Sequence, residues 1–409
     1  MLSWCLYDFA NSFYAAVIIA TVWAAYYANE IVGNAAGAGD LWWGRAVSAS
    51  MLAVAVTSPV AGALADFAAL RKRLLVVYTL VAVLGTSLLF TVRPGMVLYG
   101  FALTVAANFG FEGALVFYNA YLPLLAEPEH QGRLSGWGFA TGYAGSLFGL
   151  AAALPLVQNG HYGLAFLLVA ACFLVFALPA FVYLPADAPR RKGLRQAARE
   201  GLHGTWSTLQ EIVRKPALRR FMLAYFVYID GINTVIYFSS IFAAHTLGFS
   251  MLQLILVFIV VQLSALIGAL VWARPTDRIG PKRVILIMLV QWATVVVGAY
   301  FVTSKLQFFI LAALAGTGLG AVQSASRAFL ARMIPSERAG EFFGFYALSG
   351  KTASIVGPLV FGFVSVLSGG NQRLSVLSVL LFLVTGAGLL WGVKAGGPAV
   401  ALAAEAGGR

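Results

Sequence analysis

The sequence is poor in charged residues. Asp, Glu, Lys and Arg make up only 10% of its 409 residues, whereas 61% are hydrophobic. Soluble domains carry about 25% charged residues, so a soluble enzyme or soluble binding module is not expected. The apolar residues form runs of roughly 18 residues or more, the length that crosses about 30 Å of hydrocarbon. The chain is therefore predicted to be an all-α integral membrane protein.

Cysteine and histidine are also scarce. Cys5 and Cys172 both lie inside apolar runs, so we expect small core residues and neither a disulfide framework nor a structural zinc site. The four histidines fall in or near predicted loops without metal-ligand spacing. Gly344 and Gly350-Lys351 stand one residue too far apart for a phosphate-binding loop. We therefore expect no metal, no cofactor and no enzymatic activity.

Twelve transmembrane helices are predicted from the apolar runs. They cover residues 3–28, 42–64, 74–92, 96–122, 135–157, 162–184, 218–244, 252–273, 284–303, 306–331, 341–367 and 373–394. Most connections are short, but the one between Pro185 and Pro216 is long and divides the helices six plus six. The expected organisation is an N-terminal bundle (residues 1–184), a cytoplasmic linker (185–217), a C-terminal bundle (218–394) and a cytoplasmic tail (395–409).

The net charge of +12 follows a topological pattern. With the N-terminus in the cytoplasm, 21 of the 27 Lys and Arg fall in cytoplasmic segments, four in outer loops and two inside helices. This excess satisfies the positive-inside rule and suits an anionic inner leaflet. Both termini are therefore expected in the cytoplasm, the lipid bilayer is the expected partner, and nucleic-acid binding is not expected. Short loops and an excess of Arg over Lys favour a bacterial inner (plasma) membrane, with an organelle membrane as the alternative.

The linker is predicted to contain an amphipathic helix at the inner membrane surface. Its apolar residues recur every three or four positions, as the spacing of a single helix face requires. They are Leu194, Ala198, Leu202, Trp206, Leu209 and Val213. A flexible linker is the alternative.

Both halves repeat the same polar patterns. Asp8-x-x-Asn11-Ser12 in the first span matches Asp230-x-x-Asn233-Thr234 in the seventh, and in each case the polar residues share one helix face. An acidic helix end followed by a basic cluster also occurs twice. The first copy is Asp66 with Arg71, and the second is Asp277 with Arg278, Lys282 and Arg283. Such repeats are typical of transporters built from two pseudo-symmetric bundles.

These loop patterns resemble the Gly-x-x-x-Asp-(Arg)-x-Gly-x-Lys/Arg-Lys/Arg signature of the major facilitator superfamily, with Phe67 in place of the usual Arg and Ala273 in place of a Gly. Further motifs resemble the vacuolar-effluxer family, which is named for a yeast autophagy-related amino acid exporter. They are Trp4-x-x-Tyr7-Asp8-x-Ala10-Asn11-Ser12, Phe117-Tyr118-Asn119-Ala120-x-Leu122-Pro123, Tyr228-x-Asp230-Gly231, Ser326-Arg327 and Phe342-Phe343-Gly344-x-Tyr346-x-x-Ser349-Gly350-Lys351. The resemblance implies the major facilitator fold: twelve helices in two pseudo-symmetric six-helix bundles.

The resemblance also implies that the first, fourth, seventh and tenth helices line one substrate site. Their polar residues are Asp8, Asn11, Glu112, Asn119, Asp230, Asn233, Gln323 and Arg327, to which we add Tyr118, Tyr143 and Lys351. Carboxylates can bind the ammonium group of a zwitterion, and Arg or Lys its carboxylate. Ionisable residues cost about 2.5–3.5 kcal/mol at the bilayer centre, so they are expected to face a wet cavity or one another. Structural pairing, for example of Lys351 with Asp230, is the alternative.

Protons are a further expected partner. Burial favours the neutral form of a carboxylic acid, so Asp8, Glu112 and Asp230 are the candidates for proton coupling. The charged loop residues, namely Asp66, Arg71, Asp277, Arg278, Lys282 and Arg283, are expected to latch a cytoplasmic gate or else only to set topology.

The predicted function is a secondary active transporter that exports small organic solutes, amino acids by resemblance, through alternating access. A monomer is expected. The alternatives are a lipid or drug exporter on the same fold and a membrane receptor or scaffold without transport.

Overall fold

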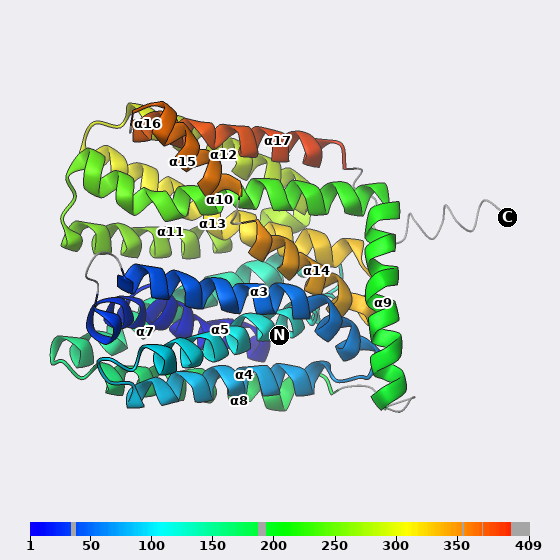
Figure 1. Ribbon diagram of the computed structural model, residues 1–409. Helices are drawn as coiled ribbons and strands as arrows, with labels where there is room; N and C mark the ends of the chain where they lie inside the picture. Colours follow the sequence, from blue (N-terminus) through cyan, green and yellow to red (C-terminus); the bar gives the residue numbers. More distant parts are fainter. Residues whose placement is uncertain (34–37, 187–193, 354–355, 370, 394–409) are drawn as a thin grey trace. The chain divides into compact units, whose positions relative to one another are not determined.

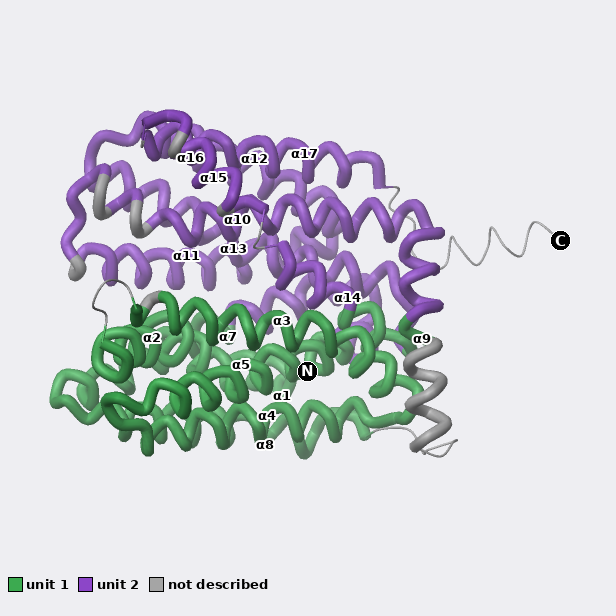
Figure 2. The backbone as a smooth tube through the Cα atoms, viewed as in Figure 1, with its two compact units in different colours: residues 1–121, 141–205, 337–344 green, residues 122–140, 206–336, 345–409 purple. Residues whose placement is uncertain are grey.

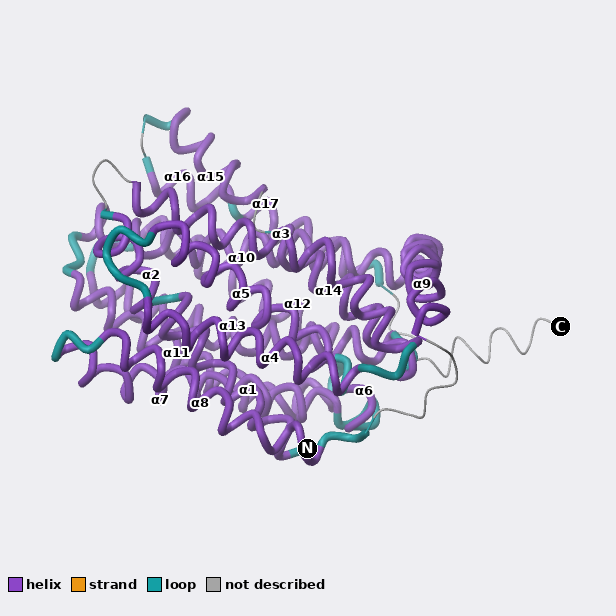
Figure 3. The backbone as a smooth tube through the Cα atoms, turned by 60° about the horizontal axis from the view of Figure 1, so that its bottom comes forward, coloured by secondary structure: helices purple, strands orange, loops and turns teal. Residues whose placement is uncertain are grey.

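Figure 1 shows the computed structural model, which describes residues 1–33, 38–186, 194–353, 356–369 and 371–393. Every regular element in these ranges is a helix, and eleven helices among them are long and apolar enough to cross a membrane. The connections between helices are short and lie at helix ends (Figure 3). The protein is therefore a multi-pass membrane protein.

The first sequence half begins with an irregular span. It runs through α1 (Leu2–Phe13), the π-helix η1 (Tyr14–Ile19), α2 (Val22–Tyr26) and the π-helix η2 (Tyr27–Val32). The other helices are α3 (Ala38–Phe67), α4 (Arg71–Leu88) with the 3-10 turn η4 (Leu89–Thr91), α5 (Val97–Asn119), α6 (Leu122–Leu125), α7 (Gln131–Gln158) and α8 (Tyr162–Tyr183). π-helical segments often occur at functional sites, and η1 directly follows the Asp8 motif.

The second half contains α9 (Leu194–Arg214), α10 (Pro216–Leu247), α11 (Met251–Arg278), α12 (Pro281–Phe301) and α13 (Lys305–Met333). These are followed by η5 (Ser336–Arg338), α14 (Ala339–Thr352), α15 (Val356–Leu367), α16 (Gln372–Ser378) and α17 (Leu380–Trp391). In the span predicted over residues 341–367, the described residues form α14 and α15, and residues 354–355 between them lie outside the described residues.

Local sequence explains where several of these helices begin and end. Ser250 and Ser304 form capping boxes with Gln253 and Gln307 at the starts of α11 and α13, which satisfies orphan backbone N–H groups. Gly280 has φ 89° between α11 and α12, a backbone conformation that side chains disfavour. Pro281 then starts α12, because a first-turn proline loses no helical hydrogen bond.

The chain divides into two compact units (Figure 2). Unit 1 holds residues 1–121, 141–205 and 337–344, and unit 2 holds residues 122–140, 206–336 and 345–409. Each sequence half therefore contributes a short segment to the other half's unit: the start of α7 belongs to unit 2, and the start of α14 belongs to unit 1. In unit 1 the main packing partners are α4 with α5, α1 with α8 and α3 with α5; in unit 2 they are α11 with α13, α12 with α13 and α10 with α17.

The linker contains the helix that its periodicity predicted. In α9, Thr208 and Ile212 are buried, whereas Trp206 and Val213 on the apolar stripe are exposed. The side chains of Leu194, Ala198 and Leu202 lie outside the described residues. The part of α9 that is described thus directs apolar side chains outward, as a helix on a membrane surface does.

Candidate functional site

A polar centre in unit 1 is built around Asp8, which is only 7% exposed. The Tyr118 hydroxyl donates to Asp8 Oδ2 at 2.7 Å, and Asn11 Nδ2 donates to Asp8 Oδ1 at 3.4 Å. The Ser12 hydroxyl donates back to the Asp8 carbonyl at 2.7 Å. Three predicted site residues, Asp8, Asn11 and Tyr118, therefore meet in one place.

Aromatic residues hold this centre in position. The Trp4 ring stacks on Tyr118 with centroids 4.5 Å apart, and Trp4 Nε1 donates to the Tyr118 carbonyl at 2.9 Å. The Tyr7 ring also stacks on Tyr118, with the ring centroids 5.1 Å apart. The Tyr7 hydroxyl shares a 2.6 Å hydrogen bond with the Thr79 hydroxyl. All four side chains are buried. Locked rotamers of this kind keep a polar group in a fixed geometry.

The other predicted residues of unit 1 lie on the same helices or their neighbours. Glu112 is buried on α5, where its neighbour Phe111 contacts the Tyr14 ring at 4.8 Å. Asn119 is the last residue of α5, and Tyr143 is half-buried on α7. Gly142 and Gly145 let α7 approach α1 closely, because a Cβ at Gly142 would lie 3.0 Å from Ser12 Oγ.

A second polar centre, in unit 2, is built around Asp230, which is 1% exposed. Asp230 Oδ2 accepts a 2.8 Å hydrogen bond from the N–H of Gly357, near the start of α15. The Thr234 hydroxyl donates to the Asp230 carbonyl at 2.7 Å, which repeats the Ser12–Asp8 bond. The N-terminus of a helix favours a negative charge, so Asp230 acts as a cap for α15. Gly357 was not among the predicted site residues, because nothing in its local sequence indicates this contact.

Arg327 is the buried cation of unit 2, at 3% exposure. Its Nε donates to Ser135 Oγ at 2.9 Å and its Nη2 donates to the Ser135 carbonyl at 2.8 Å. The guanidinium carbon lies 4.2 Å from the centre of the Phe139 ring, within cation–π range. Ser135 and Phe139 were not predicted, because nothing in the local pattern of α7 distinguishes them. Asn233, Gln323 and Lys351 are half-buried in unit 2.

In unit 1, Asp66 at the end of α3 contacts the start of α14. Asp66 Oδ1 accepts from Arg71 at 2.7 Å, and Oδ2 accepts from the N–H of Glu341 at 3.0 Å. Glu341 lies in the first turn of α14 and pairs with Arg338 at 3.0 Å. Gly340 makes this approach possible, since a Cβ there would lie 2.7 Å from Asp66 Oδ1. Asp66 thus caps α14.

Asp277 does the same for α7 in unit 2. Its two oxygens accept from the N–H groups of Gly132 and Arg133 at 2.8 and 3.0 Å. Its cations are Arg332, at 2.9 Å, and Arg133, at 3.7 Å, and not Lys282 as the loop sequence suggested. Lys282 instead donates to the carbonyls of Trp391, the last residue of α17, and of Val393, just after it, at 2.7 and 2.6 Å. The Arg278 and Arg283 side chains are exposed.

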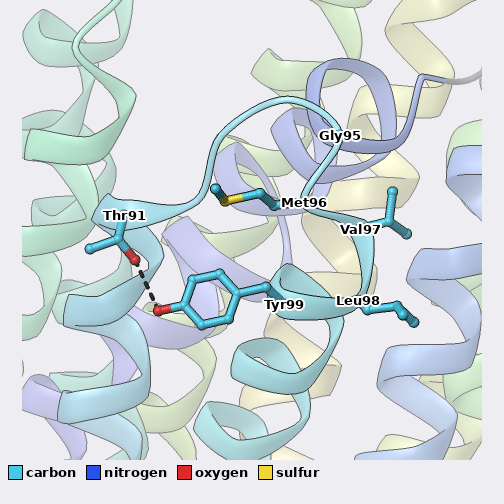
Figure 4. A pocket seen from close by; sticks show the side chains of 6 residues that line it. All are labelled: Thr91, Gly95, Met96, Val97, Leu98 and Tyr99. Carbon is cyan, nitrogen blue, oxygen red and sulfur yellow. Dashed lines mark hydrogen bonds between the residues drawn. The ribbon is translucent and has the colours of Figure 1, made fainter.

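A shallow pocket of about 550 Å³ lies at the turn between η4 and α5 (Figure 4). Thr91, Gly95, Met96, Val97, Leu98 and Tyr99 line it, and the hydroxyls of Thr91 and Tyr99 are 3.1 Å apart. None of the predicted site residues reaches this pocket, and Leu98 and Met96 are exposed beside it. The polar centres around Asp8 in unit 1 and Asp230 in unit 2 therefore remain the candidate functional sites.

Comparison with known proteins identifies relatives across most of the chain. The family described as "Vacuole effluxer Atg22 like" matches residues 45–397. The MFS-type transporter YxiO of Bacillus subtilis is 30% identical over 400 residues, covering 93% of this chain and 92% of that protein. Autophagy-related protein 22 of Kluyveromyces lactis is 24% identical over 352 residues, covering 77% of this chain and 71% of that protein.

Solved structures share the fold. The human organic anion transporter MFSD10 has a TM-score of 0.73 at 18% identity, with 95% of this chain and 97% of that chain covered. The E. coli fucose:proton symporter FucP has a TM-score of 0.73 at 14% identity, with 96% and 97% covered. Both are transporters with the twelve-helix major facilitator fold, so the fold predicted from the sequence is confirmed. The expectation of a transporter rather than an enzyme is confirmed by the relatives.

Proposed function

Because the chain belongs to the Atg22-like vacuole effluxer family of MFS-type transporters, we propose that it exports amino acids or similar small organic solutes by alternating access. The single observation that carries the proposal is the pair of buried carboxylates at matched positions, Asp8 in α1 and Asp230 in α10. Each has the same i+4 hydroxyl bond to its own carbonyl. Two such residues are costly in a bilayer, which favours a role beyond packing.

The chemistry of these centres suits a zwitterion. Asp8 and Asp230 offer carboxylates for an ammonium group, and buried Arg327 offers a planar guanidinium for a carboxylate. The remaining proposed contacts are Asn11, Glu112, Tyr118, Asn119, Tyr143, Asn233, Gln323 and Lys351. The organic anion named for MFSD10 makes organic anions the next substrate class to test.

Proton coupling follows from the bond between Asp230 and α15. The charged carboxylate accepts the Gly357 N–H at 2.8 Å, and a bond to an ionised acceptor is stronger than one to a neutral acid. Protonation of Asp230 therefore weakens the cap of α15, which provides a link between proton binding and helix position. Asp8 and Glu112 are the other proposed proton sites.

The capping contacts of Asp66 and Asp277 support a gate that opens during transport. Each carboxylate binds the N-terminus of one helix and at least one arginine at the same time. Neither bond is covalent, so the helix ends can separate when the transporter changes state. Lys282 has a different role in this proposal: it caps the carbonyls at the end of α17.

We place the protein in the inner (plasma) membrane as a monomer, with both termini in the cytoplasm. The excess of basic residues in the linker and in the first turns of α4 and α12 supports this orientation. Relatives described as vacuole effluxers make an organelle membrane the alternative.

Uptake into proteoliposomes across a panel of amino acids and organic anions, with and without a pH gradient, tests the proposal. We expect flux of at least one amino acid, and we expect Asp230→Asn to slow it by about tenfold or more, since charged hydrogen bonds contribute about 1.5–3 kcal/mol. Glu30→Gln, at an exposed acidic residue of η2, is the matched control. Absence of amino acid flux under every condition would remove the substrate proposal, and pH-driven flux through Asp230→Asn would remove its coupling role.

A further inference from the structure

A second pocket lies in unit 1, where α4 begins and α8 ends. It has a volume of about 580 Å³ and is lined by Lys72, Arg73, Val76, Val77 and Ala186. The two helices pack against each other. None of the lining residues belongs to the polar centres or to the capping contacts of Asp66, so this pocket is separate from the candidate functional site.

Two cations form the polar rim of the pocket. Lys72 Nζ donates to the carbonyls of Val182 and Leu184 at 3.1 and 2.8 Å. These carbonyls lie at the end of α8, where the helix offers them no N–H partner. The Arg73 side chain is exposed and forms no hydrogen bond or ion pair with any residue that the structure describes. The rim thus combines an ammonium group fixed in place with a guanidinium that faces outward.

An apolar stripe leads away from this rim. On α4 the exposed side chains are Val77, Leu80 and Leu84, spaced three and four residues apart on one face. On α8 the exposed side chains are Val175, Leu178 and Val182, with the same spacing. Seven residues of helix span about 10 Å. The stripe is therefore long enough to contact much of one lipid acyl chain.

We propose that this pocket binds an anionic phospholipid of the inner leaflet. The phosphate lies between Lys72 and Arg73, and an acyl chain follows the stripe on α4 and α8. Charge complementarity and the continuity of the basic rim with the apolar stripe identify this occupant: a basic recess at the cytoplasmic side of a helix pair suits an anionic head group, and guanidinium binds phosphate in a bidentate manner. The inference does not depend on the transported substrate.

Binding of a fluorescent phosphatidylglycerol to the purified full-length protein in detergent micelles tests the proposal. We expect saturable binding of the lipid to the native protein. Arg73→Glu should bind about tenfold more weakly, because each basic residue near an anionic surface contributes appreciably to the binding free energy. Arg73→Lys should bind with near-native affinity. Arg93→Glu is the matched control, because Arg93 is also exposed and lies just beyond the opposite end of the same helical segment, after η4. We expect Arg93→Glu to bind as the native protein does.

Two competitors separate the lipid from other sources of phosphate. We expect unlabelled phosphatidylglycerol to displace the probe and glycerol 3-phosphate at the same concentration to leave it bound. Equal displacement by phosphatidylcholine, or equal loss of affinity in Arg73→Glu and Arg93→Glu, would overturn the proposal. Displacement of the probe by glycerol 3-phosphate, without any lipid competitor, would overturn the assignment of a lipid as the occupant. If Arg73→Glu does not purify as a single species, Arg73→Gln takes its place. The expected loss of affinity for Arg73→Gln is also about tenfold, within a factor of about three.

Discussion

Replacement of Gly357 by alanine tests the contact on which the Asp230 centre depends. A Cβ at this position would overlap Thr234 Oγ1 and lie 2.8 Å from Asp230 Oδ1, so α10 and α15 must move apart. Overpacking costs about 1–3 kcal/mol. The same movement lengthens the 2.8 Å bond from the Gly357 N–H to Asp230, and a bond to a charged group contributes about 1.5–3 kcal/mol. The expected loss of stability is roughly 2.5–6 kcal/mol.

Thermal unfolding of the purified protein measures this loss. A change of 1 kcal/mol shifts the Tm of a 150–250-residue unit by about 2–4 °C, so Gly357→Ala should melt at least about 5 °C below the native protein. Gly362→Ala is the control on the same helix, because no atom lies within 4 Å of a Cβ placed there. Its Tm should stay unchanged or rise, since alanine favours the helix over glycine.

A double variant identifies the atom responsible. Thr234→Ala removes Oγ1, so Gly357→Ala should cost less in that background than in the native protein, as expected for directly contacting residues. Identical melting of Gly357→Ala and Gly362→Ala would refute the close approach of α10 and α15, and with it the cap on Asp230.

Two further predictions concern the other buried carboxylates. Tyr118→Phe leaves the stacking on Trp4 intact but removes the hydroxyl that donates to Asp8 at 2.7 Å. We expect the free energy of unfolding, measured by thermal unfolding, to fall by about 1.5–3 kcal/mol and uptake to slow. Native stability of this variant would show that Asp8 does not need this donor. Arg332→Gln removes the 2.9 Å partner of Asp277 and should cost about 1.5–3 kcal/mol, whereas Arg278→Gln, at an exposed neighbour on α11, should have little effect on the Tm.

The repeated Asp-x-x-Asn-hydroxyl motif shows which contacts a local sequence pattern can predict. Helical spacing alone predicted that Asp8, Asn11 and Ser12 share one face, and the hydroxyl bonds of Ser12 and Thr234 are the same in both copies. The partners of the two carboxylates differ, however. Asp8 binds the Tyr118 hydroxyl, 110 residues away, and Asp230 binds the Gly357 N–H, 127 residues away. Identical motifs therefore carry different contacts.

The charged loops illustrate the same limit. The pairing of Asp66 with Arg71 spans five residues, so the loop sequence was enough to suggest it. Asp277 instead binds Arg332, 55 residues away, and two backbone N–H groups of α7. Lys282, which stands closer in the sequence, binds the end of α17. Charge type and proximity in sequence do not determine which of several cations a carboxylate reaches.

Hydrophobic run length, the placement of basic residues and the repeated motifs determined the membrane class and the family of this protein from sequence alone. These properties depend on transfer of each segment into lipid and on spacing within a helix, which are local quantities. Only the tertiary structure decided that Asp230 caps α15 and that Ser135 and Phe139 hold Arg327. Such contacts form between segments far apart in the chain, and packing chooses them among many chemically equivalent partners.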